Sequence, residues 1–321
     1  MKLGVFTVLL GQQKLEDVLK YLSDQGVQAI ELGTGGYPGT AHAPAAELLA
    51  DKAKLDAFKK TIKDSGMEVS ALSCHGNPIH PQKDIADGFH QDFENTIRLA
   101  EELELERVIT FSGCPGDSPD AKYPNWVTCP WPDDFLKVLE YQWDDVLIPY
   151  WKKAAEQAQS HGVKKICFEM HPGFCVYNTE SMLKIRNAVG DTLGANFDPS
   201  HLTWQGMDPI AAIRKLGPAI YHFHAKDTKI DRINTSVNGV LDVKHYGDEI
   251  NRSWVFRTIG YGNDYQFWKD MFSTLRMVGY DDVVSIEHED SLMSVNEGLT
   301  KAITFLKEVM LFEDQGGMWW A

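Results

Sequence analysis

Short apolar, β-branched runs alternate with segments of helical period along the whole chain, and this alternation constrains the fold more than any other feature. Strands that alternate with helices are typical of βαβ units around a parallel sheet. Eight strand-type runs are present, at residues 3–9, 29–32, 68–73, 107–111, 165–170, 193–197, 220–224 and 283–287. Eight such units predict an α/β fold of the (β/α)8 TIM-barrel type.

Amphipathic segments fill the intervals between these runs. They predict helices at residues 55–65, 89–103, 150–161, 179–189, 209–216 and 295–310. Several end at a glycine, which ends helices readily, and the next strand follows within a few residues. The segments after the strands are longer, notably 113–134 and 227–263. A barrel that works at the carboxyl ends of its strands shows this asymmetry.

Nothing in the composition divides the chain into separate domains. Its 321 residues lie within the range of one α/β barrel, and there is no linker, internal repeat or shift in composition. We therefore predict a single domain over residues 1–321. The doubly wound open sheet is the rival architecture, but the sequence GTGG at 33–36 does not match the G-x-G-x-x-G phosphate-binding loop of that fold.

Charge and cysteine usage limit the partners and the compartment. The formal net charge is −15 and no basic run is present, which disfavours nucleic acid and membrane surfaces. Five cysteines without a C-x-x-C pair disfavour a disulfide framework and a structural zinc site, so we expect a soluble cytoplasmic protein. The apolar Met318, Trp319 and Trp320 favour a homo-oligomer, with packing on their own barrel as the simpler alternative.

Four consecutive predicted strands end in a side chain that can bind a metal. The sequences are FEMH at 168–171, NFDPSH at 196–201, HFHAKD at 222–227 and IEHE at 286–289. A carboxylate at the end of an apolar strand is costly to desolvate unless it is paired or bound to a cation. Each residue alone would more simply cap a helix or meet a lysine, but four ends in succession indicate one shared cation.

The expected metal ligands supply three carboxylates and one imidazole. They are Glu169, Asp198, His224 and Glu287. Oxygen ligands with one histidine suit Mn, Mg or Co better than a thiolate-type zinc site does. We expect Mn, with Mg, Co and Zn as alternatives.

In combination these strand ends resemble the xylose isomerase-like barrel superfamily, whose members include ketose 3-epimerases, inosose dehydratases and apurinic-site endonucleases. The resemblance covers nearly the whole chain. Its most telling parts are Glu169, Asp198 with His201 three residues later, the H-x-H-x-K-D sequence at 222–227, and Glu287. The combination is specific for the superfamily but not for one reaction.

The resemblance implies a divalent-metal-dependent sugar isomerase or epimerase of carbohydrate metabolism. It implies that the four ligands named above bind the metal, and that Glu169 and Glu287 are the catalytic acid/base pair. In such chemistry a cation stabilises an enediolate while a positioned carboxylate removes the proton next to a carbonyl. The expected partner is a small sugar or polyol.

Further side chains at strand ends or in the long loops are candidates for substrate binding. They are His75, Trp126, Trp131, His171, His201, Lys226 and Arg257. Each has a simpler structural alternative. His201 would otherwise orient Asp198, and Lys226 would otherwise pair with Asp227. The two loop tryptophans would otherwise pack on their own barrel.

Three other functions stay open. Ile230 stands where ketose 3-epimerases carry an arginine six residues after the metal histidine, so a dehydratase or a lyase acting on a keto-glycoside is the first alternative. An apurinic-site endonuclease is disfavoured by Ser112 and Gly113 at the place of a needed histidine, and by the acidic charge. A non-catalytic sugar-binding barrel would keep four buried ligands without chemistry.

Overall fold

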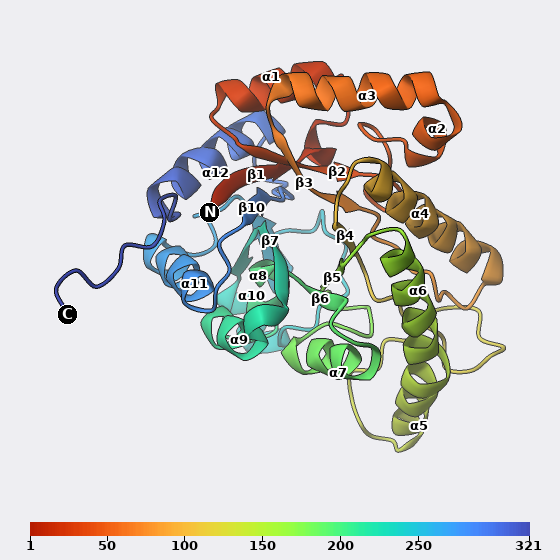
Figure 1. The fold of residues 1–321 in the computed structure, drawn as a ribbon. Coiled ribbons are helices and arrows are strands. Elements are labelled where there is room, and N and C mark those ends of the chain that lie inside the picture. The colour runs from red at the N-terminus through yellow and green to blue at the C-terminus, as the bar shows by residue number, and fades with distance from the viewer.

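A closed barrel of eight parallel strands forms the centre of the computed structural model, which describes residues 1–321 (Figure 1). The strands are β1 (Lys2–Phe6), β2 (Ala29–Gly33), β3 (Glu68–Ser73), β4 (Arg107–Thr110), β5 (Lys165–Glu169), β6 (Leu193–Phe197), β7 (Ile220–Ala225) and β10 (Val283–Ile286). They follow one another around the barrel in chain order, and β1 closes it by pairing with β10. The (β/α)8 fold predicted from the alternation is confirmed.

Helices surround the barrel (Figure 1). They are α1 (Leu15–Asp24), α2 (Ala45–Ala50), α3 (Lys52–Ser65), α4 (Lys83–Glu102), α5 (Asp134–Glu140), α6 (Ile148–Ser160), α7 (Thr179–Val189), α8 (Pro199–Thr203), α9 (Pro209–Leu216), α11 (Tyr265–Met277) and α12 (Val295–Val309). In α12 the buried Leu299, Ile303 and Leu306 recur at helical spacing, so that one face packs on the strands. None of the helices combines the length and apolar character needed to cross a membrane.

The helix starts differ most from prediction. α4 begins at Lys83, six residues before the predicted start, and α3 begins at Lys52 instead of 55. Residues 52–54 and 83–88 are exposed or half-buried, so no buried apolar face marks the starts of these helices. Asp51 starts α3 by accepting hydrogen bonds from the backbone amides of the second and third helical residues. At the other end Gly66 has a φ of 70°, which confirms the predicted glycine stop.

The first strand is shorter than predicted. β1 ends at Phe6, and Thr7–Leu10 form one turn of 3-10 helix, so the predicted strand over 3–9 was too long. The side chain of Val8 is 38% exposed, because the turn directs it away from the core. An uninterrupted apolar run carries no period that marks where a strand ends.

The long segment after β7 is a folded excursion. It contains an antiparallel pair that was not predicted, β8 (Asp227–Ile230) with β9 (Trp254–Arg257), and the short helix α10 (Arg232–Asn238). Trp204 and Trp254 stack with ring centroids 4.5 Å apart and form a small buried cluster with Phe256. The excursion is therefore packed against the carboxyl end of the barrel, where it places Phe256.

Candidate active site

The carboxyl ends of β5, β6, β7 and β10 bring four metal-capable side chains to one point. They are Glu169, Asp198, His224 and Glu287, called the cluster below, and one ligand atom of each lies within 4.8 Å of the others. A parallel barrel presents the carboxyl ends of its strands on one face, which is why strand-end residues meet. The structure thus brings together the four expected ligands, and their binding of a metal stays a prediction.

Glu169 is held from several sides. Its Oε1 lies 3.0 Å from His201 Nε2, and its Oε2 lies 3.0 Å from His75 Nε2 and 3.1 Å from His224 Nδ1. Burial disfavours the carboxylate, but hydrogen bonds from these imidazoles hold the pKa of Glu169 well below its usual range. Glu169 therefore stays ionised, the form that can bind a cation or accept a proton.

Asp198 keeps one oxygen without a hydrogen-bond donor. Its Oδ1 accepts the backbone N–H of Ser200 at 2.8 Å and starts α8, whereas the fully buried Oδ2 has no such partner. The Nζ of Lys226 lies 3.2 Å from Oδ2 without hydrogen-bond alignment. Burial raises the pKa of Asp198 to about 7, although the Lys226 charge opposes this rise. A buried carboxylate oxygen without an aligned donor has the lone pairs that a cation ligand needs.

Lys226 is a buried ammonium among carboxylates. Its Nζ donates to Glu287 at 2.9 Å and to Glu289 at 3.1 Å, and it lies 4.7 Å from the centre of the Phe256 ring. Burial disfavours the charge, but the surrounding carboxylates, Asp198 first, hold the pKa of Lys226 well above its usual value. Lys226 therefore carries a fixed positive charge beside the cluster.

Asp227 has a structural role, and the alternative in which it pairs with Lys226 is wrong. Its Oδ2 accepts the backbone N–H groups of Gly260, Gly262 and Asn263 at 2.9 to 3.0 Å. A side chain at Gly262 would meet the Asp227 carboxylate at 2.5 Å, so the loop needs glycine there. Asp227, the aspartate of the H-x-H-x-K-D sequence, thus binds the loop at residues 260–263 that follows β9. Lys226 faces the cluster instead.

Glu31, at the end of β2, was missed from the sequence. It is fully buried, and its two oxygens lie 2.8 and 2.9 Å from His224 Nε2. The hydroxyls of Ser73 and Ser285 donate to it at 2.6 and 2.7 Å. Because a carboxylate only accepts, His224 donates from Nε2 to Glu31, and the oxygens of Glu169 and Glu287 at 3.1 Å from Nδ1 favour the doubly protonated ring. A cation bound at Nδ1 would displace the proton there, while Glu31 keeps the one on Nε2. The signal in the sequence that could have identified Glu31 is a single glutamate within the apolar strand at residues 29–33.

His222 belongs to a hydrogen-bonded network below the cluster. It lies with Glu31 and His224 in a second group of metal-capable residues. Its Nδ1 is 3.0 Å from Asn196 Oδ1 and its Nε2 is 3.3 Å from Ser70 Oγ. Since both ring nitrogens and both oxygens of Glu31 already have partners, this second group is a polar network and not a metal site.

The cluster has the charge that a divalent cation would offset. The carboxylates of Glu31, Glu169, Asp198 and Glu287 are buried or nearly buried around two cations, the Lys226 ammonium and the His224 imidazolium. Burial disfavours the charge on His224, but the surrounding carboxylates, Glu31 first, hold the pKa of His224 well above its usual value. Four negative and two positive charges leave a surplus of two when Asp198 is ionised. Such a surplus is costly away from water unless a cation, or a proton on Asp198, neutralises it. Together with the Asp198 Oδ2 that lacks a hydrogen-bond donor, it makes the site fit a divalent metal.

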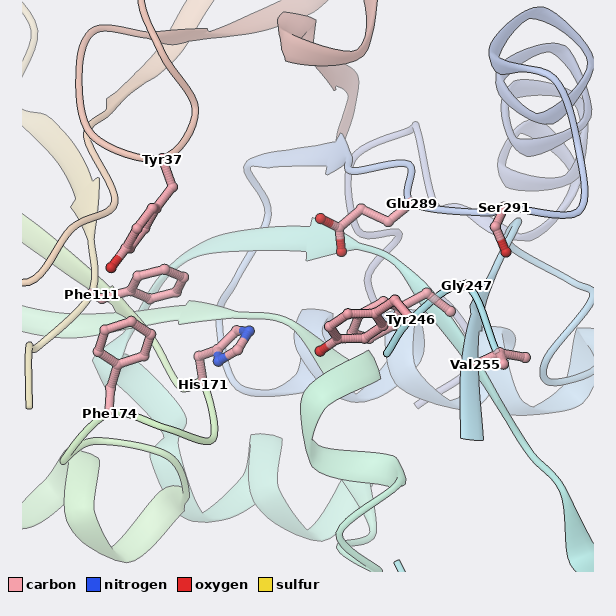
Figure 2. Close-up of a pocket in the computed structure, with 10 residues that line it drawn as sticks. Tyr37, Phe111, His171, Phe174, Tyr246, Gly247, Val255, Glu289 and Ser291 are labelled. Carbon is pink, nitrogen blue, oxygen red and sulfur yellow. The ribbon is translucent and has the colours of Figure 1, made fainter. Parts of the chain in front are cut away.

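A cavity of about 530 Å³ opens at the carboxyl end of the barrel (Figure 2), and it is connected to the cluster through the contacts of its lining residues, since no cluster residue lines the cavity itself. Glu289 lines it and binds Lys226. His171 also lines it, with its ring 4.0 Å from that of His201. The cavity therefore gives a ligand access to the groups around the cluster.

The substrate-binding candidates fall into two groups. His75 and His201 are buried, and both contact Glu169. His201 Nε2 lies 3.0 Å from Glu169 and 3.3 Å from Asp198, so its closer carboxylate partner is Glu169. Gly36, in the loop after β2, has a φ of 64°, and a side chain there would meet the His75 carbonyl oxygen at 2.0 Å. This close approach of Gly36 fixes the backbone of His75. Tyr37, which follows Gly36 in the chain, lines the cavity.

Three other candidates lie elsewhere. Arg257 donates from Nε to Asp290 at 3.1 Å, which ties β9 to the loop after β10. Trp126 packs edge-on against Tyr177 in a separate pocket, and Trp131 is 75% exposed. The structure does not bring these side chains into the cavity beside the cluster, so their contact with a substrate stays a prediction without structural support.

The chain belongs to the xylose isomerase-like TIM barrel family, whose model matches residues 19–309. Among individual proteins it is similar to the uncharacterized protein YfiH of Bacillus subtilis. The two are 41% identical over 313 residues, which cover 97% of this chain and 99% of YfiH.

Two solved structures share the fold at low sequence identity. The probable 3-DHS dehydratase AsbF of Bacillus anthracis is 18% identical, with a TM-score of 0.66 over 96% of this chain and 99% of AsbF. A D-psicose 3-epimerase is 15% identical, with a TM-score of 0.62 over 97% of this chain and 99% of the epimerase. The same fold therefore occurs in a probable dehydratase and in an epimerase, so the reaction of this chain has to be argued from its site.

Proposed function

We propose that this protein is a divalent-metal-dependent isomerase or epimerase that moves a proton next to the carbonyl of a sugar or polyol. The observation that supports this most is the convergence of two carboxylates from separate strands. Oxygens of Glu169 and Glu287 each lie 3.1 Å from His224 Nδ1. Carboxylates that approach one point from two sides can take a proton from one face of a carbon and return one to the other.

Glu169, Asp198, His224 and Glu287 are the proposed ligands of the cation, with Mn preferred and Mg, Co and Zn as alternatives. Bound there, the cation would supply Lewis-acid stabilisation of the negative charge that develops on the substrate oxygens. This ligand set is supported by the Oδ2 of Asp198, which lacks a hydrogen-bond donor, and by the contact of Glu31 with His224 Nε2, which turns Nδ1 toward the other three ligands.

Glu169 and Glu287 are suited to different parts of the proton transfer. The side chain of Glu287 is 13% exposed against 2% for Glu169. Although burial opposes ionisation, the Lys226 charge holds the pKa of Glu287 below its usual value, so it is a carboxylate before reaction. We propose that Glu287 removes the substrate proton and that Glu169, fixed by its imidazole partners, acts at the other face. Lys226 holds the charge balance as Glu287 changes its protonation state.

The remaining proposals concern the setting of the protein. The substrate is proposed to be the only partner in catalysis, within a single domain over residues 1–321. Five free cysteines, four of them buried, support a reducing cytoplasm. Met318, Trp319 and Trp320 are 70%, 89% and 68% exposed, which supports a homo-oligomer that covers them.

Proton exchange in D2O tests the reaction directly. The metal-loaded protein is incubated with ketoses, inososes and keto-glycosides, and NMR follows deuterium incorporation at carbon. We expect metal-dependent exchange that Glu287→Gln loses. An inverted or isomerised product supports this proposal, whereas an unsaturated product or a released leaving group would favour the dehydratase or lyase. Metal-loaded protein that exchanges no proton in any substrate would contradict carbon-acid chemistry.

A further inference from the structure

The cavity beside the cluster has two aromatic walls. In the first wall Phe111 and Phe174 stack with ring centroids 4.2 Å apart, and Tyr37 lies 6.2 Å from Phe111. In the second wall Tyr246 and Phe256 stack at 5.8 Å. Figure 2 shows Tyr37, Phe111 and Phe174 on one side of the space and Tyr246 on the other. Planar apolar groups can therefore be held from two sides.

Two charged or ionisable lining residues connect the cavity to the cluster. Glu289 is bound to Lys226, and the His171 ring contacts the ring of His201. Six of the ten lining residues are aromatic or aliphatic, and the remaining side-chain polar groups of the cavity are the hydroxyls of Tyr37, Tyr246 and Ser291. A hydroxyl that loses water without a new hydrogen bond binds poorly. The cavity is thus most polar toward the cluster and mainly aromatic elsewhere.

The second wall is held by the protein itself. The Arg252 guanidinium lies 4.4 Å from the Tyr246 ring and 4.6 Å from the Trp254 ring. Arg252 is only 2% exposed, and its Nε donates to the Trp254 carbonyl at 3.1 Å. A buried arginine therefore supports Tyr246 from behind, although that ring is half exposed. A wall held in place before binding loses little entropy when a ligand arrives.

The cavity also has more room than a monosaccharide needs. At the volume share of a water molecule, about 30 Å³ for each non-hydrogen atom, a hexose of about 12 such atoms takes up about 360 Å³. The cavity has about 530 Å³. The remaining space, about 170 Å³ by this generous count, lies beside the aromatic walls because the polyol belongs at the polar end.

We propose that the substrate is a carbonyl-bearing sugar or polyol that carries a planar apolar substituent, as an aryl keto-glycoside does; simple aryl glycosides then serve as non-reacting binding analogues. The substituent lies between the wall of Phe111 and Phe174 and the wall of Tyr246 and Phe256. The polyol lies toward Glu289 and the cluster, and this placement rests on the proposed function. A free monosaccharide would leave the aromatic walls in contact with water.

The test compares matched ligands on the metal-loaded protein. Phenyl and methyl β-glycosides of glucose, galactose and mannose are titrated by calorimetry, and saturation-transfer NMR reports which ligand protons touch the protein. For at least one sugar we expect the phenyl glycoside to bind at least tenfold tighter than the methyl glycoside, about 1.4 kcal/mol, with the strongest transfer on the phenyl protons. Equal affinities for all three pairs would overturn the proposal.

Variants assign the preference to the walls. Phe174→Ala and Tyr246→Ala should reduce the ratio of phenyl to methyl glycoside affinity to about threefold or less. Tyr123→Ala is the matched control, because Tyr123 is an exposed tyrosine outside the cavity, and it should keep the full preference. Circular dichroism and metal content confirm that each variant is folded. A phenyl preference that survives both wall variants would contradict the proposal.

The failure of this inference is distinguishable from the failure of the proposed function. If small ketoses exchange deuterium but phenyl glycosides gain no affinity, the substrate class is wrong and the reaction stands. If the phenyl preference holds and depends on the walls while no substrate exchanges a proton, the reaction is wrong and the binding site stands. Strong transfer to the sugar ring protons from the wall aromatics would mean that the walls sandwich the sugar itself, which would also overturn the inference.

Discussion

The two ends of the barrel treat buried charge in opposite ways. At the amino end, called the floor below, Arg107 at the start of β4 donates to Asp282, which precedes β10, and to the Ser70 carbonyl of β3. One cation is thus paired with one anion. At the carboxyl end, the carboxylates of Glu31, Glu169, Asp198 and Glu287 outnumber the cations of Lys226 and His224. The matched charges of the floor stabilise the fold, whereas we propose that the surplus at the cluster costs stability and serves cation binding. The following predictions separate these two roles.

The largest effect is expected from Glu287→Gln. This substitution removes the proposed base while it keeps the shape of the side chain, so proton exchange should fall by about 10² to 10⁴. The thermal midpoint of the metal-free protein should fall modestly, because Lys226 and His224 lose a charged partner whose lowered pKa shows that it stabilises the fold. Exchange NMR and calorimetry measure the two quantities. A variant that loses activity through unfolding would leave the role of Glu287 unsupported.

Glu31→Gln should weaken metal binding by about 10 to 100-fold, because the amide no longer fixes the proton on His224 Nε2. Titration of Mn²⁺ into wild type and variant measures the loss. Glu68→Gln is the matched control on the neighbouring strand β3, since Glu68 is exposed and pairs with Lys2. An unchanged affinity in Glu31→Gln would show that this carboxylate only supports the fold.

Metal affinity should depend on pH through Asp198. Burial raises the pKa of Asp198 in the metal-free protein to about 7, and a cation must displace that proton to use Oδ2. Affinity is therefore full above pH 7 and should be about tenfold weaker at pH 6, falling further as pH drops. Calorimetry at several pH values, with proton release measured in two buffers, tests this dependence. A flat profile between pH 6 and 8 would disagree with a protonated Asp198.

The smallest effect is expected at the barrel floor. Asp282→Asn leaves Arg107 without its partner, and because the Asp282 side chain is 36% exposed, the free energy of unfolding should fall by only about 1 to 2 kcal/mol. Metal affinity and proton exchange should not change. Urea denaturation measures the first quantity, and a loss of metal binding in this variant would break the distinction between the two ends.

The barrel was predictable because its periodicity is local, whereas parts of the site depend on contacts across the barrel. Glu169, Asp198, His224 and Glu287 follow strand ends, so the sequence alone indicated that they meet. The contact of Glu31 with His224 joins residues 193 positions apart, and no periodicity shows it.

Loop geometry limited the rest. Trp126 lies in a segment without a repeating pattern, and its packing against Tyr177 was decided by tertiary contacts that the sequence does not display. The pair β8 and β9 was hidden because 23 residues separate these short strands, so no tight-turn signal marks them as a hairpin. Tyr246 and Phe256 come from that excursion, which is why the second aromatic wall emerged only from the structure.

Titration of metal-free protein with Mn²⁺, in wild type and in Asp198→Asn, tests the central claim most directly. The charge surplus and the Asp198 Oδ2 that lacks a hydrogen-bond donor predict one equivalent of metal bound by wild type and an affinity at least 100-fold weaker in the variant, which should remain folded. Wild-type protein that binds no divalent cation, or an Asp198→Asn variant that binds as well as wild type, would contradict the assignment of the cluster as a metal centre.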